Sequence, residues 1–310
     1  MKERIMKLLE ENKDYNINLK ETIYILSSNK CNNDCIFCTD YNYKNKKKYS
    51  PVKSIPKKYY QHRIVFTASE PTMNNNLINL IKEAKVRNYK DIVIITNGRR
   101  LSNKNYCEKL IKSGVTEFIV SIHGATPQTH DLITGVKGSW KETICGLNNI
   151  LLLSKIYTYL NISINVTVTS LNLLEINGIK NFAISLNKIN TIVFYGLKPQ
   201  GKALLNWNKI AVKYTDIMNN LCRDNVWTPQ VRVCDIPLCI SAKYIPEKNC
   251  EFYYNDRKVL KDNKLKKHDP KDIGKIFLKK CNKCIKSNIC DGIYIKYLKI
   301  FGGKEFNAIR

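Results

Sequence analysis

Residues 21–38 read ETIYILSSNKCNNDCIFC. The run 21–29 is apolar, as is typical of a buried β-strand, and it leads directly into a loop with three cysteines. Those cysteines, Cys31, Cys35 and Cys38, have the spacing Cys-x3-Cys-x2-Cys. Three thiolates this close can each bind one iron of a cubane 4Fe–4S cluster, which leaves the fourth iron open to a substrate or cofactor. A structural zinc site would need a fourth ligand, and no His or other Cys lies nearby in the sequence.

Outward from this stretch, short apolar runs alternate with longer helical patterns. The helical patterns cover 76–88, 103–114 and 140–156, and the further strand candidates are 63–68, 91–97, 117–123, 162–168 and 191–197. Strands that alternate with helices form βα units and a parallel sheet. Six strands, counting 21–29, are too few for a closed eight-stranded barrel. The sequence therefore predicts an α/β fold, a partial (β/α)6 TIM-like barrel with the cysteine loop at its functional mouth.

The strand–helix alternation stops near residue 225. Beyond it Pro, Cys and Lys become more frequent, the apolar runs shorten, and six of the twelve cysteines lie between Cys234 and Cys290. We therefore expect three parts, which are an N-terminal amphipathic helix in 1–20, the partial barrel in 21–225 and a small cysteine-rich domain in 226–310.

The composition places the chain among folded proteins, because 44% of its 310 residues are apolar and 25% are charged. The net charge of +26 has two interpretations. A basic surface could attract nucleic acid, a phosphorylated substrate or an acidic protein. Alternatively, AT-rich coding has dispersed lysines over a solvated surface, and the even spread outside Lys44–Lys48 and Lys261–Lys267 favours this second interpretation.

The cysteines point to metal binding. The N-terminus lacks the apolar core of a signal peptide, and no apolar run reaches the ~18 residues of a membrane-spanning helix. These features predict a cytoplasmic protein without a membrane segment. Thiols stay reduced in the cytosol, so clustered cysteines indicate metal ligands before disulfides.

The cysteine triplet has the spacing typical of the radical S-adenosylmethionine (SAM) superfamily, and Phe37 precedes its last cysteine as an aromatic residue often does there. The chain resembles that superfamily over roughly its first two-thirds. The resemblance implies that SAM binds the open iron through its amino and carboxylate groups. Electron transfer would then cleave SAM homolytically to a 5′-deoxyadenosyl radical.

Further motifs extend the resemblance. The segment 67–72, TASEPT, is similar to the family's Gly-Gly-Glu-Pro segment, with Ala68 and Ser69 in place of the glycines, and it implies that Glu70 contacts the SAM amino group. Thr96-Asn97-Gly98 resembles a family turn that lines the site. At later strand ends the resemblance assigns SAM contacts or pocket positions to Ser121, Asn165, Asn172 and Tyr195. His123, also at a strand end, is either an acid–base group or a hydrogen-bonded wall residue.

A second cysteine set has the spacing Cys281-x2-Cys284-x5-Cys290. Together with one distant cysteine it could hold an iron–sulfur cluster or a tetrahedral zinc ion. The segment resembles the extension called twitch, the short relative of the SPASM domain, which implies one auxiliary 4Fe–4S cluster. The expected fourth ligand is Cys239, with Cys234 or Cys250 as alternatives. The remaining thiols, Cys107, Cys145 and Cys222, lie in helical patterns and are expected to be ordinary buried residues.

The predicted function is radical SAM chemistry in peptide or protein modification, since relatives with this extension most often crosslink, epimerise or oxidise ribosomal peptides. Only 20 residues precede the expected barrel, so we expect a peptide to bind without a leader-recognition module or with a separate partner. One alternative is a small-molecule, nucleotide or RNA modifier, favoured by the charge and by YNYKNKKKY (41–49). Another is a non-enzymatic iron–sulfur or zinc scaffold. An enzyme of this kind would need an electron donor such as flavodoxin or ferredoxin.

Overall fold

The computed structural model describes residues 22–40, 52, 55, 57, 62–225, 227–251, 257–261, 264–267 and 274–310. The expected helix over 1–20 and the aromatic–basic run 41–49 lie outside the described residues.

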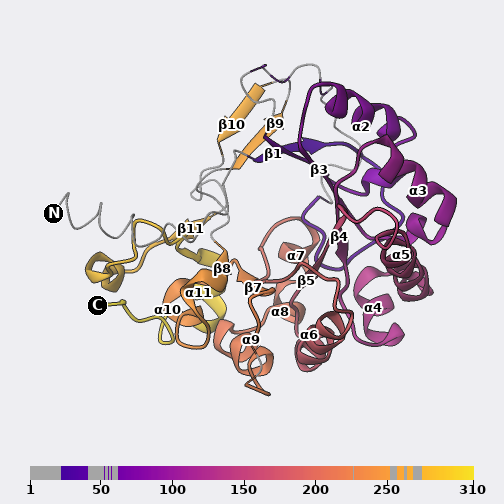
Figure 1. Cartoon of the computed structure of the whole chain (residues 1–310). Coiled ribbons are helices and arrows are strands. Elements are labelled where there is room, and N and C mark those ends of the chain that lie inside the picture. Colours follow the sequence, from indigo (N-terminus) through magenta and orange to yellow (C-terminus); the bar gives the residue numbers. More distant parts are fainter. Residues whose placement is uncertain are drawn as a thin grey trace.

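A curved parallel sheet forms the centre of the molecule (Figure 1). Its strands include β1 (Thr22–Leu26), β2 (Arg63–Thr67), β3 (Asp91–Thr96), β4 (Glu117–Ser121), β5 (Asn161–Thr167) and β6 (Thr191–Tyr195). Each of the six lies within or close to a run expected from the sequence, and they follow one another in chain order. This arrangement confirms the α/β partial barrel.

The same sheet continues on both sides of these six strands. On one side β6 pairs with β7 (Val231–Cys234), which pairs with β8 (Cys250–Glu251). On the other side β1 pairs in parallel with β9 (Arg257–Lys261), and β10 (Lys264–Lys267) is antiparallel to β9. The region after residue 225 therefore contributes strands to the barrel sheet as well as a cysteine-rich segment.

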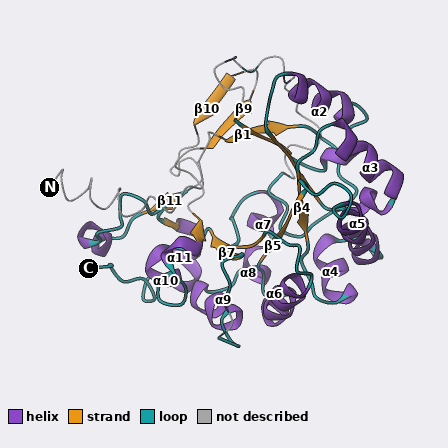
Figure 2. Cartoon of the chain, in the orientation of Figure 1, coloured by secondary structure: helices purple, strands orange, loops and turns teal. Residues whose placement is uncertain are grey.

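Helices cover the outer, convex face of the sheet (Figure 2). They are α2 (Leu77–Val86), α3 (Lys104–Ser113), α4 (Pro127–Thr134), α5 (Ser139–Leu153), α6 (Ile176–Ser185), α7 (Gly201–Leu205), α8 (Trp207–Ile210) and α9 (Tyr214–Leu221). Each longer helix turns one apolar face inward, as Leu147, Ile150 and Leu153 of α5 show. A side chain of this type contributes about 1.5–3 kcal/mol when fully buried.

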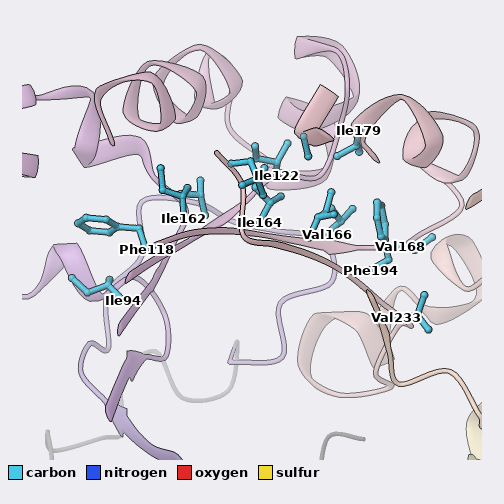
Figure 3. Close-up of a cluster of buried hydrophobic side chains, with 14 of the residues drawn as sticks. Ile94, Phe118, Ile122, Ile162, Ile164, Val166, Val168, Ile179, Phe194 and Val233 are labelled. Carbon is cyan, nitrogen blue, oxygen red and sulfur yellow. The ribbon is translucent and has the colours of Figure 1, made fainter. Parts of the chain in front are cut away.

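The core lies between the helices and the convex face of the sheet. In Figure 3, Phe118, Ile162, Ile164 and Val166 of the central strands form one apolar row, which reaches towards Ile179 of α6 at its Val166 end. All five side chains are almost completely buried. Because strand residues alternate between faces, the intervening residues point to the concave side.

The C-terminal segment forms a compact unit. It contains α10 (Leu238–Ser241), the antiparallel pair β11 (Lys275–Ile276) and β12 (Ile293–Tyr294), the 3-10 helix η9 (Lys279–Lys283) and α11 (Ile295–Phe301). Tyr297 of α11 stacks on Tyr214 of α9 with ring centroids 4.1 Å apart, and its hydroxyl accepts the Tyr214 N–H at 2.8 Å. Among the described residues, no helix has the length and apolarity needed to span a bilayer.

Candidate functional site

The cysteine loop follows β1 at the carboxyl-terminal edge of the sheet. Its three thiols, all half-buried, belong to Cys31, Cys35 and Cys38. Backbone hydrogen bonds fix the loop from two sides. The N–H groups of Asp34 and Ile36 donate to carbonyl oxygens at the end of α4, at 2.8 and 2.9 Å, and the Cys38 carbonyl accepts the Lys202 N–H of α7 at 2.8 Å. These hydrogen bonds hold the loop against the end of α4 and the start of α7.

The start of α7 packs directly on this loop. Gly201 has a φ of +55°, and a Cβ there would lie 2.3 Å from the Cys38 carbonyl oxygen. The Lys202 ammonium pairs with the Asp34 carboxylate at 2.5 Å. Asn206, one residue beyond the helix, donates its side-chain amide to the Ile36 carbonyl at 3.0 Å. Only glycine permits this close approach of two backbones.

A third support comes from the turn after β3. The Asn97 amide donates to Asn32 Oδ1 at 2.7 Å, and its nitrogen lies 4.0 Å from Cys31 Sγ. The Arg99 guanidinium donates to the Asn32 carbonyl and, at 2.9 Å, to Asn33 Oδ1. These supporting residues carry no strong sequence signal, apart from the position of Asn97 in the Thr-Asn-Gly turn.

Glu70 lies immediately beneath this support and is 1% exposed. Its carboxylate accepts the backbone N–H and hydroxyl of Thr72, at 3.0 and 2.7 Å, the Thr96 hydroxyl at 2.6 Å and the Asn97 N–H at 2.7 Å. Burial raises the pKa of Glu70 above its usual value, although the hydrogen bonds oppose the shift. Both oxygens thus join the ends of β2 and β3, and a direct contact from this carboxylate to SAM stays a prediction.

The two residues that replace the family glycines adopt a glycine-like backbone. Ala68 has a φ of 71° and Ser69 a φ of 48°, both in the left-handed region. The Ser69 N–H donates to Asp40 Oδ2 at 2.8 Å, and the Glu70 N–H donates to the Lys30 carbonyl at 3.0 Å. The turn therefore keeps its close contact with the cysteine loop at the expense of local strain.

Three further candidates share the concave face. Ser121 lies opposite Asn165 in the register of β4 and β5, and Asn165 lies opposite Val193, two residues before Tyr195. Residues directly opposite one another in a sheet project to the same side, and so do residues two apart in a strand. Ser121, Asn165 and Tyr195 are all partly exposed, so the concave face presents polar groups.

A second set of thiols surrounds a cavity in the C-terminal segment. The cavity volume, taken as the room for the centre of a water molecule, is about 20 Å³. Its walls include Leu238, Phe306 and the four cysteines Cys239, Cys281, Cys284 and Cys290. The two alternative candidates for the fourth ligand do not line the cavity. Cys234 is buried in β7, and Cys250 donates its thiol to Ser241 Oγ at 3.2 Å. Burial raises the pKa of Cys239 to about 11, and the neighbouring thiols act in the same direction.

Residues 25–164 match the family model of the Radical SAM superfamily. This stretch of the chain, a little under half of it, is a radical SAM domain. Such a domain implies a 4Fe–4S cluster and SAM, and the three thiols on one loop fit the ligand set that the cluster requires.

Several known proteins are similar to this radical SAM chain. Two relatives named "Probable GTP 3′,8-cyclase", from Saccharolobus islandicus and Saccharolobus solfataricus, are each 26% identical over 151 residues, covering 47% of this chain and 48% of theirs. The "AdoMet-dependent heme synthase" of Methanosarcina barkeri is 34% identical over 111 residues, 36% of this chain and 30% of that protein. The chain thus spans about half the length of the cyclase relatives.

The fold is also similar to a solved structure. The crystal structure of HydG, a maturase of the FeFe-hydrogenase, superposes with a TM-score of 0.51 over 69% of this chain and 50% of that chain, at 14% identity. At this identity the likeness concerns the fold alone.

Two histidines lie beside the radical SAM cysteine loop. His123 packs edge-on against Phe37 at 4.7 Å between ring centroids, and its Nδ1 accepts the Thr167 N–H at 3.2 Å. His130 Nδ1 accepts the His123 N–H at 3.2 Å. Burial lowers the pKa of His123 to about 3 and that of His130 to about 4. Both rings are therefore neutral near pH 7, and the hydrogen-bonding pattern matches a wall residue better than an acid–base group.

The three unassigned thiols differ from one another. Cys107 is fully buried, and burial raises its pKa to about 12. Cys222 is half-buried. The prediction of a buried thiol was wrong for Cys145, which is exposed. The reason is that α5 packs through the adjacent Gly146, where a Cβ would lie 2.2 Å from the Gly98 carbonyl oxygen, and this turns residue 145 outward.

A buried charge cluster connects the barrel to the C-terminal segment. Asp235, directly after β7, lies 3.1 Å from the Lys198 ammonium and 3.1 Å from that of Lys275 in β11. Tyr294 of β12 donates its hydroxyl to Asp235 at 3.3 Å. Burial alone would raise the pKa of Asp235, but the two lysines outweigh it and hold the pKa below its usual value. Sequence patterns gave no indication of this long-range contact.

Proposed function

We propose that this chain is a radical SAM enzyme that reductively cleaves SAM to a 5′-deoxyadenosyl radical and abstracts hydrogen from a substrate. The observation that carries the proposal is the fixed loop of Cys31, Cys35 and Cys38 at the mouth of the partial barrel. When bound there, the iron–sulfur cluster would supply the electron for SAM cleavage.

The chain's own residues would hold and orient the cofactors. The contacts of α4, α7 and Asn97 keep the thiols at one side of the mouth. Ser121, Asn165 and Tyr195 offer hydroxyl and amide groups on the concave face, where SAM and the substrate would have to meet. Glu70 would act on SAM mainly by positioning the turns at the ends of β2 and β3.

We also propose an auxiliary 4Fe–4S cluster held by Cys239, Cys281, Cys284 and Cys290. These four thiols surround one cavity. The spacing Cys281-x2-Cys284-x5-Cys290, with Cys239 beside it, resembles the twitch extension, and this resemblance favours a polynuclear cluster over a tetrahedral zinc ion. Residues 226–310 would then act as a twitch-type unit that also contributes strands to the barrel sheet.

For the substrate we propose a peptide or protein, as the twitch-like cysteine pattern suggests. A second class, a nucleotide or another small molecule, is favoured by a specific observation, namely the similarity to relatives named GTP 3′,8-cyclase. The chain spans about half the length of those relatives, so GTP is one candidate substrate to be tested. SAM cleavage that is accelerated by GTP, but not by candidate peptides, would favour the second class.

The decisive experiment replaces Cys31, Cys35 and Cys38 together by Ala. After anaerobic reconstitution, the parent should carry about eight irons in two cubane sites, and the variant about four. With SAM and dithionite, the parent should form 5′-deoxyadenosine and the variant none.

Cys145→Ala is the matched control, because this exposed thiol belongs to neither site. Formation of 5′-deoxyadenosine by the triple variant at the parent rate would refute the radical SAM assignment. Stoichiometric zinc with four irons in the parent would instead refute the auxiliary cluster alone.

A further inference from the structure

His130 of α4 has a buried ring nitrogen that the protein itself does not satisfy. The side chain is 1% exposed, and its Nδ1 accepts the His123 N–H at 3.2 Å. Burial lowers the pKa of His130 to about 4, so the ring is neutral near pH 7 and carries its single proton on Nε2. This Nε2 has no hydrogen-bond partner among the described residues. Because a buried N–H without an acceptor costs free energy, we expect its acceptor to be a group other than the polypeptide.

The neighbouring histidine is not that acceptor. His123 Nδ1 accepts the Thr167 N–H at 3.2 Å, so the proton of this neutral ring is also on Nε2. The two rings stack with their centroids 6.0 Å apart. The nitrogens of an imidazole face in diverging directions. The bond from His130 Nδ1 to the end of β4 therefore directs Nε2 away from that strand.

The cysteine loop passes the end of α4 one helical turn beyond His130. The carbonyl oxygens of Ile133 and Thr134, three and four residues later, accept the N–H groups of Ile36 and Asp34. One turn of an α-helix rises about 5.4 Å. The imidazole ring is thus attached to the same part of α4 that holds the backbone of the loop.

Two further contacts place the ring close to the thiols. Phe37, which directly precedes the third thiol, packs edge-on against His123, the ring that stacks on His130. The Arg99 guanidinium donates to Asn33 Oδ1 at 2.9 Å, and its charge contributes to the low pKa of His130. The Asn33 N–H in turn donates to the first thiol, at 3.4 Å. The unsatisfied donor therefore belongs to a ring with neighbours at both ends of the cysteine triplet.

We propose that the His130 Nε2–H donates a hydrogen bond to a sulfur of the 4Fe–4S cluster held by Cys31, Cys35 and Cys38, and that it thereby raises the reduction potential of this cluster. The inference rests on the proposed radical SAM function. The sulfurs of a cluster become more negative on reduction, so a fixed donor stabilises the reduced form more than the oxidised form. The donor that is unsatisfied in the protein alone would gain its acceptor when the cluster assembles.

Two substitutions separate the roles of the two ring nitrogens. In His130→Asn the side-chain oxygen lies near the position of Nδ1, so it can accept the His123 N–H, but no donor reaches the position of Nε2. In His130→Gln the longer side chain places an amide N–H there and loses the acceptor. The measurement is the reduction potential of the first cluster in anaerobically reconstituted protein, from a redox titration followed by EPR. The variant with Ala at Cys31, Cys35 and Cys38 supplies the auxiliary signal to be subtracted.

We expect His130→Asn to shift the redox equilibrium of the cluster about tenfold towards the oxidised form, a fall of about 59 mV for one electron, and His130→Gln to stay near the parent potential. The reverse order would show that the acceptor at Nδ1 matters, and equal falls would show an effect of packing. Either result would overturn the proposal, as would unchanged potentials in both variants.

A measurement on the parent needs no substitution. In protein labelled with ¹⁵N-histidine, pulsed EPR of the reduced first cluster should detect a weakly coupled ring nitrogen, and its absence would also overturn the hydrogen bond. If the parent holds no more iron than the triple-cysteine variant, the radical SAM function and the hydrogen bond are both refuted. Unchanged potentials or a missing nitrogen coupling, with the iron present, refute the hydrogen bond alone.

Discussion

Glu70 shows at the scale of a single residue how a motif can be located without its role being known. Its position after β2 followed from the resemblance to Gly-Gly-Glu-Pro. The hydrogen bonds that its carboxylate accepts from Thr72, Thr96 and Asn97 could not be predicted from the motif. Those donors come together only because β2 and β3 are neighbouring strands. A carboxylate with both oxygens engaged by the protein is better placed to fix two turns than to bind an ammonium group.

The adjacent residues allow a prediction about stability. Ala68 and Ser69 lie in the left-handed region, which costs a non-glycine residue about 1–2 kcal/mol. Glycine would remove that strain. It also has more conformational entropy in the unfolded chain, which lowers the free energy of unfolding by about 0.5–1 kcal/mol. Ala68→Gly and Ser69→Gly should therefore each stabilise the protein by up to about 1 kcal/mol, which is a rise in Tm of about 2 °C.

Ala242→Gly is the control for this pair in anaerobic thermal melts. Ala242 is exposed and has a right-handed φ of −67°, so the glycine there relieves no strain and should lower the Tm. If Ala68→Gly and Ser69→Gly lower the Tm as Ala242→Gly does, the left-handed turn is not a source of strain.

The auxiliary thiols mark the limit of sequence reasoning at this scale. The spacing of Cys281, Cys284 and Cys290 is local, so it could be recognised from the sequence alone. The fourth ligand is far away in sequence, so Cys239 was expected there only with Cys234 and Cys250 as alternatives. The structure distinguishes these three cysteines, because only Cys239 lines the cavity.

At the scale of elements, the strands were predictable and the short helices were not. Runs such as 91–97 gave β3 because buried strands are apolar over their whole length. The five residues of α7 are too few to show a helical period, so the sequence contained no sign of the element that holds the Cys38 carbonyl. Its role depends on a glycine rather than on an apolar face.

Gly201→Ala should therefore disturb the first iron site. The new Cβ would lie 2.3 Å from the Cys38 carbonyl oxygen and 2.8 Å from that of Thr39, so α7 or the loop must shift. We expect anaerobic reconstitution to yield roughly half the parent iron, with the loss confined to one of two cubane sites.

The matched control is Gly178→Ala in α6, where the new Cβ would meet only the Ala125 side chain at 3.6 Å. It should keep the full iron content, and as an exposed helical position it should stabilise α6 by about 1 kcal/mol. Full iron in Gly201→Ala would show that the contact of α7 with the loop is dispensable.

At the scale of the whole molecule, the sheet continues past residue 225, where the sequence pattern changes. β7 and β8 are short, and β9 returns to pair with β1 (Figure 1). Pairings between strands so far apart in sequence leave no local pattern. The C-terminal segment is therefore connected to the barrel both by the sheet and by the charge cluster around Asp235.

This connection gives the prediction for the whole molecule. Asp235→Asn keeps the left-handed backbone, which Asn tolerates, but removes the carboxylate between Lys198 and Lys275. Removing the nearest carboxylate from two buried ammonium groups, of which Lys275 keeps the longer 3.7 Å pair with Asp291, should cost about 3 kcal/mol. Since Lys275 and Tyr294 belong to the C-terminal segment, the loss should appear there first. We expect amide hydrogen exchange in residues 274–310 to accelerate while the barrel strands stay protected.

Asp224→Asn separates this effect from general destabilisation. Asp224 pairs at 2.6 Å with Lys180, whose side chain is completely buried, but both residues lie outside the C-terminal segment. It should destabilise the region of α6 and α9 and leave the exchange of 274–310 close to the parent rate. Cys239 follows Asp235 in the chain and the other three cavity thiols follow Lys275, so Asp235→Asn should also lower the affinity for auxiliary iron. Identical exchange patterns for the two variants would mean that the ion cluster stabilises the fold without specifically holding the cysteine-rich segment on the barrel.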